Sequence, residues 1–533
     1  MANELDKVVE DSTRGGFFLM LGTVLSTVIM AIAAILVGRL LGPALYGEYA
    51  LALVIPTLLS IFGDFGINTG TVKFAASLHS RGEDKQIRKI ILTGLLFQAL
   101  VGLGISGVSF AFADFFAVLI NRPGLSFYIQ IMSISILFQT IYAAVMSIFV
   151  GLDKTEYNAL TGGIQAAAKT VSSIALVLLG FSVAGAALGY VTGYAVAGTI
   201  GVGVVFFKIL RPIKKGDNGG FVQTLKMLVN YGTPLYVTVL LIGFIPLYQQ
   251  VILAFFASNF DVGNFRAAAN FLTLISTIPS SIASALLPAF SKLDFLRAEG
   301  LKVFFKRANK YTCLVIVPIA TLVIILSEEV VQVIYGSAYQ SASLFLSIGC
   351  LSYFLAGLGY LTLFSLFNGL GETRTTLKIT AVNFFIMLAL VPILASAYGV
   401  PGVMLTSLLS NAIAITYGAI IARTRFKIEF DVYPTIKIYL VSAASAVPSL
   451  LLLRFTSLSN LVTLIAGGIL YLLVYITLVP LVKIIGYYEL QKATQVINKI
   501  RVLAPIAKPV LKYQEKILRL RTVEQSPKNS QAT

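Results

Sequence analysis

Few charged side chains lie inside the long apolar stretches of this 533-residue chain, and Lys169 is the most informative of them. Thr161, Gln165 and Ser172 share its helical face at three- and four-residue spacings. A cation in the middle of a membrane span costs about 2.5–3.5 kcal/mol to insert and usually faces a cavity. Two interpretations fit this position. Lys169 binds an anionic group such as a phosphate, or it forms a structural ion pair with an acid on another helix, with Asp64 as the candidate.

Asp64 is the acidic candidate among the few charged residues within the predicted spans. It lies near the inner end of the second apolar stretch, between Gly63 and Gly66. A carboxylate at this depth could pair with a cation or take up a proton or Na⁺ as a coupling site. It could also serve only as a cap or turn residue beside the two glycines. We therefore keep Asp64 as a candidate for a coupling ion.

Further polar groups stand near the ends of the apolar stretches. Arg39 and Glu48 flank an outer loop, where they either face a cleft or form an interfacial salt bridge of little energetic value. Arg266 is expected to open a helix on the outer side, where it either faces the cleft or snorkels to the surface. Some of the amides near or within spans must also line a cleft. The candidate substrate-binding residues are Lys169, Arg39, Arg266, Gln165 and Asn270.

Several chemistries are not expected. The phosphate-binding loop Gly-x-x-x-x-Gly-Lys-[Ser/Thr] does not occur in the sequence, so we expect no nucleotide hydrolysis. Cys313 and Cys350 stand in apolar runs, and His79 is the one histidine. These residues cannot assemble a metal site, and no cluster of acids or histidines suggests a lipid-modifying enzyme. We expect a protein that is not an enzyme and holds no cofactor or metal.

The composition indicates the class of protein to which these residues belong. The chain is 57% hydrophobic and 12% charged, with a mean hydropathy of +0.89. Soluble proteins carry about 25% charged residues, so this chain cannot cover a water-facing surface of its size. A soluble enzyme, a nucleic-acid-binding module and a disordered chain are excluded as the whole molecule. The remaining class is an all-α polytopic membrane protein.

The apolar stretches can be divided into spans by length. A bilayer core needs about 20 apolar helical residues. The 44 uncharged residues between Lys378 and Arg423 must form two helices with a break at 398–402, and the 38 between Lys169 and Lys208 must divide near Gly180. We predict fourteen transmembrane helices, near 16–37, 45–67, 90–112, 127–150, 159–179, 184–207, 229–256, 267–290, 311–334, 343–368, 376–397, 402–422, 437–453 and 460–482.

Alternate loops between these helices are strongly basic, which indicates the orientation. Both termini fall on the basic side, so we expect a multi-pass protein of the cell membrane with cytoplasmic N and C termini. The net charge of +17 then reflects topology, and no nucleic-acid partner is expected. The basic side carries Lys73, Arg81, Lys85, Arg88, Lys89, Lys208, Arg211, Lys214, Lys215, Lys226, Lys292, Arg297, Lys302, Lys306, Arg307, Lys310, Arg423, Arg425, Lys427 and Lys437.

An internal repeat is visible at a nearly constant spacing. The segment 46–49 is echoed by 262–265 and the segment 81–83 by 297–299, each 216 residues later. The segment 151–155 is echoed 218 residues later. The period covers six spans, an even number, so the two repeats lie parallel in the membrane. Two six-helix bundles facing a central cleft are typical of transporters.

The motif Gly38-Arg39-Leu40-Leu41-Gly42-Pro43-Ala44-Leu45-Tyr46-Gly47-Glu48-Tyr49-Ala50-Leu51, followed by Gly63-Asp64-Phe65-Gly66-Ile67, resembles the polysaccharide-biosynthesis flippases. These form the Wzx-like branch of the multidrug/oligosaccharidyl-lipid/polysaccharide exporter superfamily. The echo in the second half and the connection at 151–155 fit the same family. The resemblance covers the first twelve predicted helices and implies export of a lipid-linked sugar across the bilayer.

Four regions follow from these observations. Residues 1–215 and 216–428 are expected to form two six-helix bundles, 429–482 an appended hairpin, and 483–533 a basic amphipathic cytoplasmic tail. The tail holds ten Lys and Arg against three Glu, so anionic lipids are expected partners, with a docking helix for a protein as the alternative.

We predict a flippase that translocates a lipid-linked oligosaccharide or polysaccharide unit by alternating access, with a polyprenyl-linked glycan as its substrate and glycan-assembly enzymes as candidate partners. The alternative is a cation-coupled antiporter of drugs or small molecules from the same superfamily. A scaffold subunit of a sugar-polymer machine is a third possibility.

Overall fold

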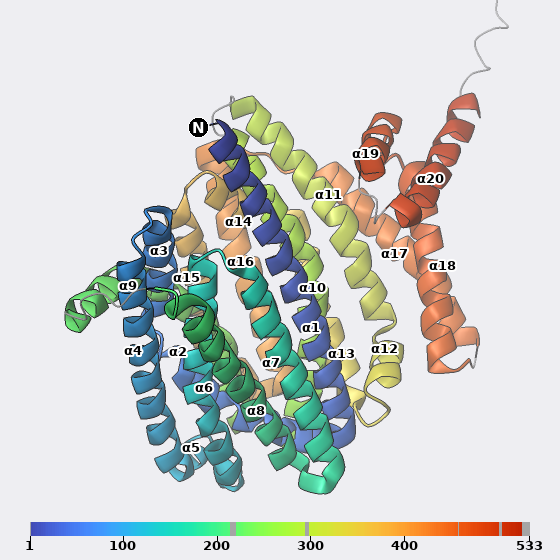
Figure 1. The fold of residues 1–533 in the computed structure, drawn as a ribbon. Coiled ribbons are helices and arrows are strands. Elements are labelled where there is room, and N and C mark those ends of the chain that lie inside the picture. The colour runs from blue at the N-terminus through green and yellow to red at the C-terminus, as the bar shows by residue number, and fades with distance from the viewer. Residues whose placement is uncertain (1, 214–219, 294–297, 457, 500–503, 525–533) are drawn as a thin grey trace, which may run out of the picture. The chain divides into compact units, whose positions relative to one another are not determined.

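A computed structural model describes residues 2–213, 220–293, 298–456, 458–499 and 504–524. Within these residues every regular element is helical, as the composition predicts. A bilayer permits this because a helix satisfies all of its backbone hydrogen bonds internally. Figure 1 shows the order of the helices along the chain. By compactness the chain divides into unit 1, residues 1–270 and 387–406, and unit 2, residues 271–386 and 407–533.

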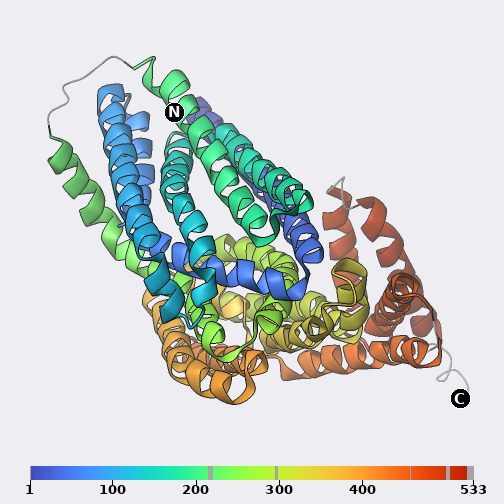
Figure 2. The ribbon, with the colours of Figure 1, turned by 90° about the horizontal axis from the view of Figure 1, so that it is seen from below.

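Unit 1 contains the elements from the N-terminus to the start of α10, together with the end of α15 and the start of α16. Its segments are α1 (Ala2–Ala52), α2 (Val54–Ile61), α3 (Ile67–Ser80), α4 (Asp84–Ala111), α5 (Ala113–Leu119), η1 (Pro123–Leu125), α6 (Ser126–Gly151), α7 (Thr155–Leu176), η2 (Val177–Phe181), α8 (Ser182–Val204), η3 (Val205–Leu210) and α9 (Phe221–Phe256). Within it α7 packs along α8, α4 along α6, and α1 along α7 (Figure 2).

Unit 2 holds the remaining helices. They are α10 (Asn259–Leu293), which begins in unit 1, α11 (Ala298–Ile325), α12 (Ser327–Ile334), α13 (Gln340–Leu351), η4 (Ser352–Leu358), α14 (Thr362–Gly369), α15 (Thr373–Tyr398), α16 (Val400–Phe426), α17 (Val432–Phe455), α18 (Asn460–Leu481), α19 (Tyr487–Lys499) and α20 (Ala504–Glu524). Here α17 packs against α18 and α11, while α20 packs against α18 and α19.

Two of the predicted breaks are confirmed by the backbone. Gly180 has a φ of 92°, and it separates α7 from α8. Gly399 has a φ of 60° and separates α15 from α16. Both positions use glycine because a left-handed backbone is unfavourable for a residue with a Cβ atom. A third break, at Gly42 with a φ of 73°, changes the direction of α1.

The predicted number of spans is not confirmed. In the described part of the chain, eleven helical segments are long and apolar enough to cross a membrane. Two of them run through the breaks just named: Ser26–Ile61 has 36 residues and Thr155–Leu210 has 56. A 56-residue helix would be about 84 Å long, almost three times the bilayer core, so that segment must cross more than once. Fourteen remains a prediction.

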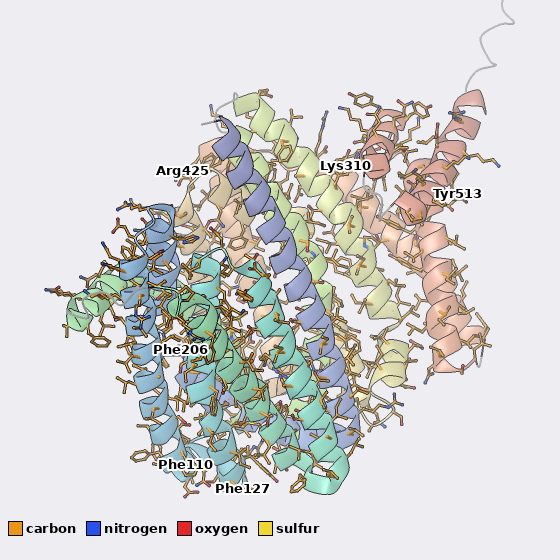
Figure 3. The ribbon with its side chains drawn as sticks, in the orientation of Figure 1. Phe110, Phe127, Phe206, Lys310, Arg425 and Tyr513 are labelled. Atoms are coloured by element: carbon orange, nitrogen blue, oxygen red, sulfur yellow. The ribbon has the colours of Figure 1, made fainter. Side chains whose placement is uncertain are left out.

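Unit 1 presents the apolar surface that a bilayer requires. Phe110 at the end of α4 is 47% exposed, and Phe127 at the start of α6 is 60% exposed (Figure 3). Further exposed Leu, Ile, Val and Phe side chains of this unit lie along α4, α7 and α8. Exposed apolar surface on this scale is typical of contact with lipid.

The internal repeat appears as a reciprocal contact inside unit 1, between α1 and the start of α10. A Cβ atom on Gly47 would lie 1.8 Å from the carbonyl oxygen of Asn259. A Cβ atom on Gly263 would lie 1.8 Å from the carbonyl oxygen of Pro43. Both pairs of equivalent residues, 43 with 259 and 47 with 263, are 216 positions apart. Such an exchange of contacts is what a two-fold relation between the repeats requires.

In unit 2, the C-terminal helices are attached through Glu489 on α19. Its carboxylate accepts hydrogen bonds from Lys310 Nζ at 2.9 and 3.0 Å and from Tyr311 Oη at 2.9 Å, both on α11. It also accepts a bond from the backbone N–H of Gly486 at 3.0 Å. Burial by itself would raise the pKa of this carboxyl, but these donors outweigh it and the pKa is lowered. Glu489 therefore stays ionised and holds α19 against α11.

The Gly47–Gly263 contact generates the first prediction. Gly47→Ala or Gly263→Ala forces two backbones apart and should lower the stability by about 1–3 kcal/mol or more. The double variant should cost clearly less than the sum, because both changes disrupt one contact. A thiol-reactive dye can follow thermal unfolding in detergent, since Cys313 and Cys350 are both buried.

The matched control is Gly104→Ala, because Gly104 lies in a helix and a methyl group added there would meet no heavy atom within 4 Å. That change should be neutral or stabilise by up to about 1 kcal/mol through helix propensity. Equal unfolding temperatures for Gly47→Ala and Gly104→Ala would contradict the close approach.

Candidate functional site

A cavity of about 160 Å³ within unit 1 contains Lys169, and we call it the Lys169 cavity. Five helices line it: α1, α2, α7, α8 and α9, together with the first turns of α10. Its lining residues are Ala33, Ala34, Val37, Tyr46, Tyr49, Leu53, Val54, Thr57, Lys169, Ser173, Tyr190, Leu247, Gln250 and Arg266. Polar and apolar residues both contribute to this lining, so the cavity can hold a ligand that carries polar groups.

The close packing of α7 on α8 places Lys169. A Cβ atom on Gly189 would lie 2.2 Å from Ser173 Oγ, and one on Gly193 would lie 2.6 Å from Lys169 Cβ. Glycines four residues apart on α8 thus let the two helices approach, as small residues do in membrane interfaces. The Lys169 ammonium lies 4.7 Å from the centre of the Tyr190 ring on α8, a cation–π contact.

Tyrosine rings form much of the polar lining of the Lys169 cavity. Tyr46 and Tyr49 on α1 stack with ring centres 6.0 Å apart. Tyr190 packs edge-on against Tyr194 at 5.2 Å, and Tyr194 packs in the same way on Tyr142 at 5.5 Å. Of these rings, Tyr46, Tyr49 and Tyr190 line the cavity. Each of the three offers an apolar face together with a hydroxyl, so the cavity can contact both ring-shaped and polar ligands.

Both charged residues that line the Lys169 cavity are cations. Lys169 and Arg266 belong to the lining, and no Asp or Glu does. In the described part of the chain neither cation forms an ion pair with a carboxylate. The structural ion pair between Lys169 and Asp64 is thus not formed here. Two like charges without a counter-ion make the cavity attractive to an anion.

The other predicted residues of this site are placed as follows. Asn270 on α10 donates a hydrogen bond from Nδ2 to the hydroxyl oxygen of Tyr46 at 2.9 Å, so it reaches the cavity through that ring. Gln165 lies one turn before Lys169 and is buried, and its Nε2 has no hydrogen-bond partner among the described residues. Arg39 is exposed and is not among the residues that line the cavity.

The position of Arg266 differs from the sequence-based expectation. We predicted a helix beginning near residue 267, with Arg266 at its outer end, but α10 begins at Asn259 and carries Arg266 two turns inside. The hydroxyl of Ser258 accepts a hydrogen bond from the backbone N–H of Asp261 at 3.1 Å and so caps the earlier start. Ser258 followed by Asp261 was the signal in the sequence that would have given this boundary.

Asp64 lines a second cavity of unit 1, of about 250 Å³, which shares no residue with the Lys169 cavity. Its Oδ1 accepts hydrogen bonds from the backbone N–H of Asn68 at 3.0 Å and from Gln98 Nε2 at 3.2 Å. The first of these bonds satisfies a backbone N–H in the first turn of α3, whose N-cap residue is Gly66, so Asp64 has the structural role in the turn that was considered above. Asp64 and Lys169 therefore belong to separate sites.

The sequence-based reasoning missed the tyrosines of the Lys169 cavity. Tyr46 and Tyr49 are three residues apart, and Tyr190 and Tyr194 are four apart, so each pair shares a helical face. That spacing was a readable signal for an aromatic face. It could not show that Tyr190 lines the same cavity as Tyr46 and Tyr49, because it lies 144 and 141 residues after them in the sequence.

Comparisons with known proteins agree on the family and the fold. The model of the family described as "Polysaccharide biosynthesis protein" matches residues 12–294, just over half of the chain. The structure is similar to that of the lipid II flippase MurJ in an inward closed conformation, with a TM-score of 0.70 and 18% identity over 87% of this chain and 99% of that one.

Two further structures share the fold at lower similarity. One is an inward-facing multidrug resistance transporter of the MATE family in the MOP superfamily, with a TM-score of 0.61 and 16% identity over 77% of this chain and 98% of that one. The other is a MOP superfamily transporter from Pyrococcus furiosus, whose binding pocket is described as having reversed polarity. Its TM-score is 0.53, with 17% identity over 78% of this chain and 95% of that one.

No curated protein sequence matches the chain. The match to the family model covers more than half of the residues and includes the motif at 38–67 and the Lys169 cavity. The resemblance seen in the sequence is therefore confirmed. The chain belongs to the polysaccharide biosynthesis protein family and has the polytopic all-α fold of the transporters of the MOP superfamily.

Proposed function

We propose that the protein is a flippase that translocates a lipid-linked oligosaccharide or polysaccharide unit across the cytoplasmic membrane by alternating access, without nucleotide hydrolysis. In this proposal Lys169 and Arg266 bind the phosphate of the substrate headgroup, and the tyrosines contact its sugar rings. The polyprenyl chain stays in the lipid. The observation that carries the proposal is a cavity with two cations and no acid among its lining residues.

The electrostatics of the Lys169 cavity support an anionic ligand. Within the described residues the two cations form no ion pair with a carboxylate, in a chain that places few charges in its spans. Such charges are costly in a membrane unless they serve a function. A phosphate supplies the missing counter-ion during transport, and the ring of Tyr190 partly compensates Lys169 in its absence.

The size of the cavity defines what this conformation can hold. A volume of about 160 Å³ is similar to that of a cavity that accommodates one benzene molecule. A phosphate group or a single sugar ring fits, whereas a whole oligosaccharide does not. The proposal therefore requires a second, wider conformation, as alternating access does in general.

The membrane potential can drive such export without ATP. Moving one elementary charge through 100 mV is worth about 2.3 kcal/mol. A headgroup with two negative charges that leaves a negative interior therefore gains about 4.6 kcal/mol.

A cation-coupled antiporter of drugs or small molecules is the alternative, because transporters of the MATE family share the fold. Organic cations would require carboxylates in the cavity, and the Lys169 cavity has none among its lining residues. The charge of the cavity therefore favours the flippase. Two results together would favour the antiporter. Inside-out vesicles would take up an organic cation equally well with the unaltered protein and with Lys169→Ala, and no export of glycolipid would be detected.

The C-terminal helix α20 supports the proposal that anionic lipids bind the tail. Lys508, Lys512 and Lys516 are exposed at four-residue spacing and form no ion pair within the described residues. On the packed side, Gln514 Nε2 donates to the carbonyl oxygen of Ile476 on α18 at 3.3 Å. Ile476 is about 7.5 Å from the end of α18, a candidate membrane span, and this contact supports a position of α20 near the membrane surface.

The role of Lys169 gives the second prediction. Lys169→Ala should abolish glycolipid export while the protein still folds, because the structural loss is limited to a cation–π contact worth about 0.5–2 kcal/mol. Lys169→Arg should keep partial activity, since the charge is retained. Export is measured in vesicles, and thermal unfolding is measured on the same preparations.

The control for Lys169 is Lys154→Ala, which removes an exposed lysine just before α7 and outside the cavity. It should leave export unchanged. Full export by Lys169→Ala, or a fall in its stability by the roughly 3–5 kcal/mol typical of a broken buried pair, would sink the substrate-site assignment.

The orientation with both termini in the cytoplasm gives the third prediction. In a background with Cys313 and Cys350 replaced by Ala, a cysteine introduced by Ser80→Cys should be protected from an impermeant thiol reagent in intact cells. One introduced by Gly124→Cys should be labelled. Both positions are exposed and lie at opposite ends of the span that contains α4. A cysteine at Gly216 should be protected like one at Ser80, but Gly216 lies outside the described residues. The reverse labelling pattern would overturn the orientation.

The basic face of α20 gives the fourth prediction. Replacing Lys508, Lys512 and Lys516 by Gln should weaken the binding of anionic lipid by about 1 kcal/mol per residue, or roughly a hundredfold in total. Titration of the protein in nanodiscs with a fluorescent anionic lipid measures this loss. A zwitterionic lipid should bind equally to both proteins. Unchanged affinity for the anionic lipid would instead favour α20 as a docking helix for a protein partner.

A further inference from the structure

The second cavity of unit 1, which contains Asp64, has the composition of a cation site. Its lining residues are Ser60, Ile61, Asp64, Asn68, Gln98, Gln139, Thr140, Ala143 and Tyr236. They carry one carboxylate and many oxygen atoms, and no Lys, Arg or His is among them. The negative charge of Asp64 thus has no cationic partner in this lining.

Two amide oxygens in this cavity lack partners. Gln98 is fully buried, with 0% of its surface exposed, and its Oε1 forms no hydrogen bond within the described residues. Asn68 Oδ1 is likewise buried and unpaired among those residues. A buried polar atom without a partner costs about 1–3 kcal/mol, and two in one cavity require an explanation. Because both atoms are acceptors beside a carboxylate, what is missing is a positive charge or a donor.

The backbone around Asp64 is broken in the manner of ion sites in membrane transporters. α2 ends at Ile61 and α3 begins at Ile67, and between them Phe65 and Gly66 have φ values of 48° and 79°. The C-terminal end of a helix carries a partial negative charge, and unwound backbone at membrane depth generally lines a cavity. The partial positive charge at the N-terminus of α3 opposes it, because the backbone N–H of Asn68 donates to Asp64. The break therefore contributes a cavity with exposed backbone, and the negative charge of the site comes from Asp64.

Packing holds this break in place. Tyr236 on α9 donates its hydroxyl hydrogen to the carbonyl oxygen of Ile61 at 2.9 Å. A Cβ atom on Gly66 would lie 2.2 Å from the carbonyl carbon of Gly232, so the backbones of the break and of α9 are in direct contact. On the other side, Gln98 on α4 donates to Asp64 at 3.2 Å, and Thr140 on α6 donates to the Gln98 carbonyl at 3.0 Å. Four segments of the chain thus converge on one preformed site.

We propose that Asp64, Asn68 and Gln98 form a binding site for one monovalent metal cation at the break between α2 and α3. Carboxylate and amide oxygens are hard ligands that suit alkali and alkaline-earth ions better than transition metals. A single carboxylate neutralises one positive charge, whereas a divalent ion would leave an excess charge in a span. Sodium is the probe of choice. The site is separate from the Lys169 cavity, so the proposal does not depend on the substrate.

The test measures thermal unfolding of the purified protein in detergent as NaCl replaces choline chloride at constant ionic strength. The chain contains no Trp, so unfolding is followed with a dye that reacts with the buried Cys313 and Cys350. A ligand that binds only the folded protein raises its stability, and the rise continues to grow with ligand concentration above Kd. We expect sodium to raise the unfolding temperature of the unaltered protein. In Asp64→Asn the apparent affinity for sodium should be about tenfold weaker, or the effect of sodium should be lost completely.

Asn68→Ala is the most informative variant, because the Asn68 side-chain oxygen makes no hydrogen bond in the described part of the chain. Its removal should leave the unfolding temperature in choline unchanged or slightly higher, and should reduce the increment caused by sodium. The matched control is Asp114→Asn, an exposed acid in the first turn of α5 that bonds Ser126 instead. This control should retain the full sodium increment.

Four results would overturn the proposal. The first is the absence of a sodium-specific increment in the unaltered protein. The second is an increment in both Asp64→Asn and Asn68→Ala that equals that of the unaltered protein. The third is a larger effect of millimolar Ca²⁺ or Mg²⁺, which would indicate a divalent site. The fourth is stabilisation by acid that depends on Asp64 without any effect of sodium, which would indicate a proton. If Asp64→Asn fails to fold, Asn68→Ala still decides the question.

Discussion

The cost of a charge in hydrocarbon is the constraint on which this structure depends. Each ionised side chain placed in a span must be compensated by a counter-ion, a cavity or a ligand. Most Lys and Arg of the chain lie outside its long apolar stretches, which agrees with this rule. Lys169 and Arg266 depart from it, and the structure brings both to the lining of one cavity. That departure is the reason for the proposal that an anionic group binds there.

Close helix contacts through glycine make this arrangement possible. Lipid chains are as apolar as Leu, so helices in a membrane associate largely by packing and hydrogen bonds. Gly189 and Gly193 bring α8 against α7 at the level of Lys169, and Gly47 and Gly263 bring the two repeats together beside Tyr46. These four glycines, of which Gly47 belongs to the family motif, thus set the positions of the neighbouring side chains Lys169 and Tyr46.

Asp64 shows how a structural role and a binding role can share one residue. Its Oδ1 accepts the backbone N–H of Asn68 in the first turn of α3, which by itself would explain an acid just before that helix. This hydrogen bond does not explain the unpaired oxygens of Gln98 and Asn68 in the same cavity. One cavity of unit 1 is therefore suited to an anion and the other to a cation, and the two are separated by their lining residues as well as by their charge.

The sequence by itself determined the features that are local along the chain. Hydropathy identified a polytopic all-α protein, glycine identified the breaks at Gly180 and Gly399, and the 216-residue offset identified equivalent segments that the structure joins at Gly47 and Gly263. These features depend on composition and on short-range backbone preferences. The division into bundles 1–215 and 216–428 stays a prediction. The compact units are defined differently and have other bounds, with residues 387–406 in unit 1.

Only the tertiary structure decided which side chains meet. From the sequence, Asp64 was one possible partner of Lys169. In the structure Lys169 contacts the ring of Tyr190 and lines one cavity with Arg266. Asp64 accepts a hydrogen bond from Gln98 instead. The physical reason is that the rotation of each helix about its axis and its depth beside its neighbours are set by packing between segments far apart in the chain. Spacing along a single helix defines a face, but it does not define what that face contacts.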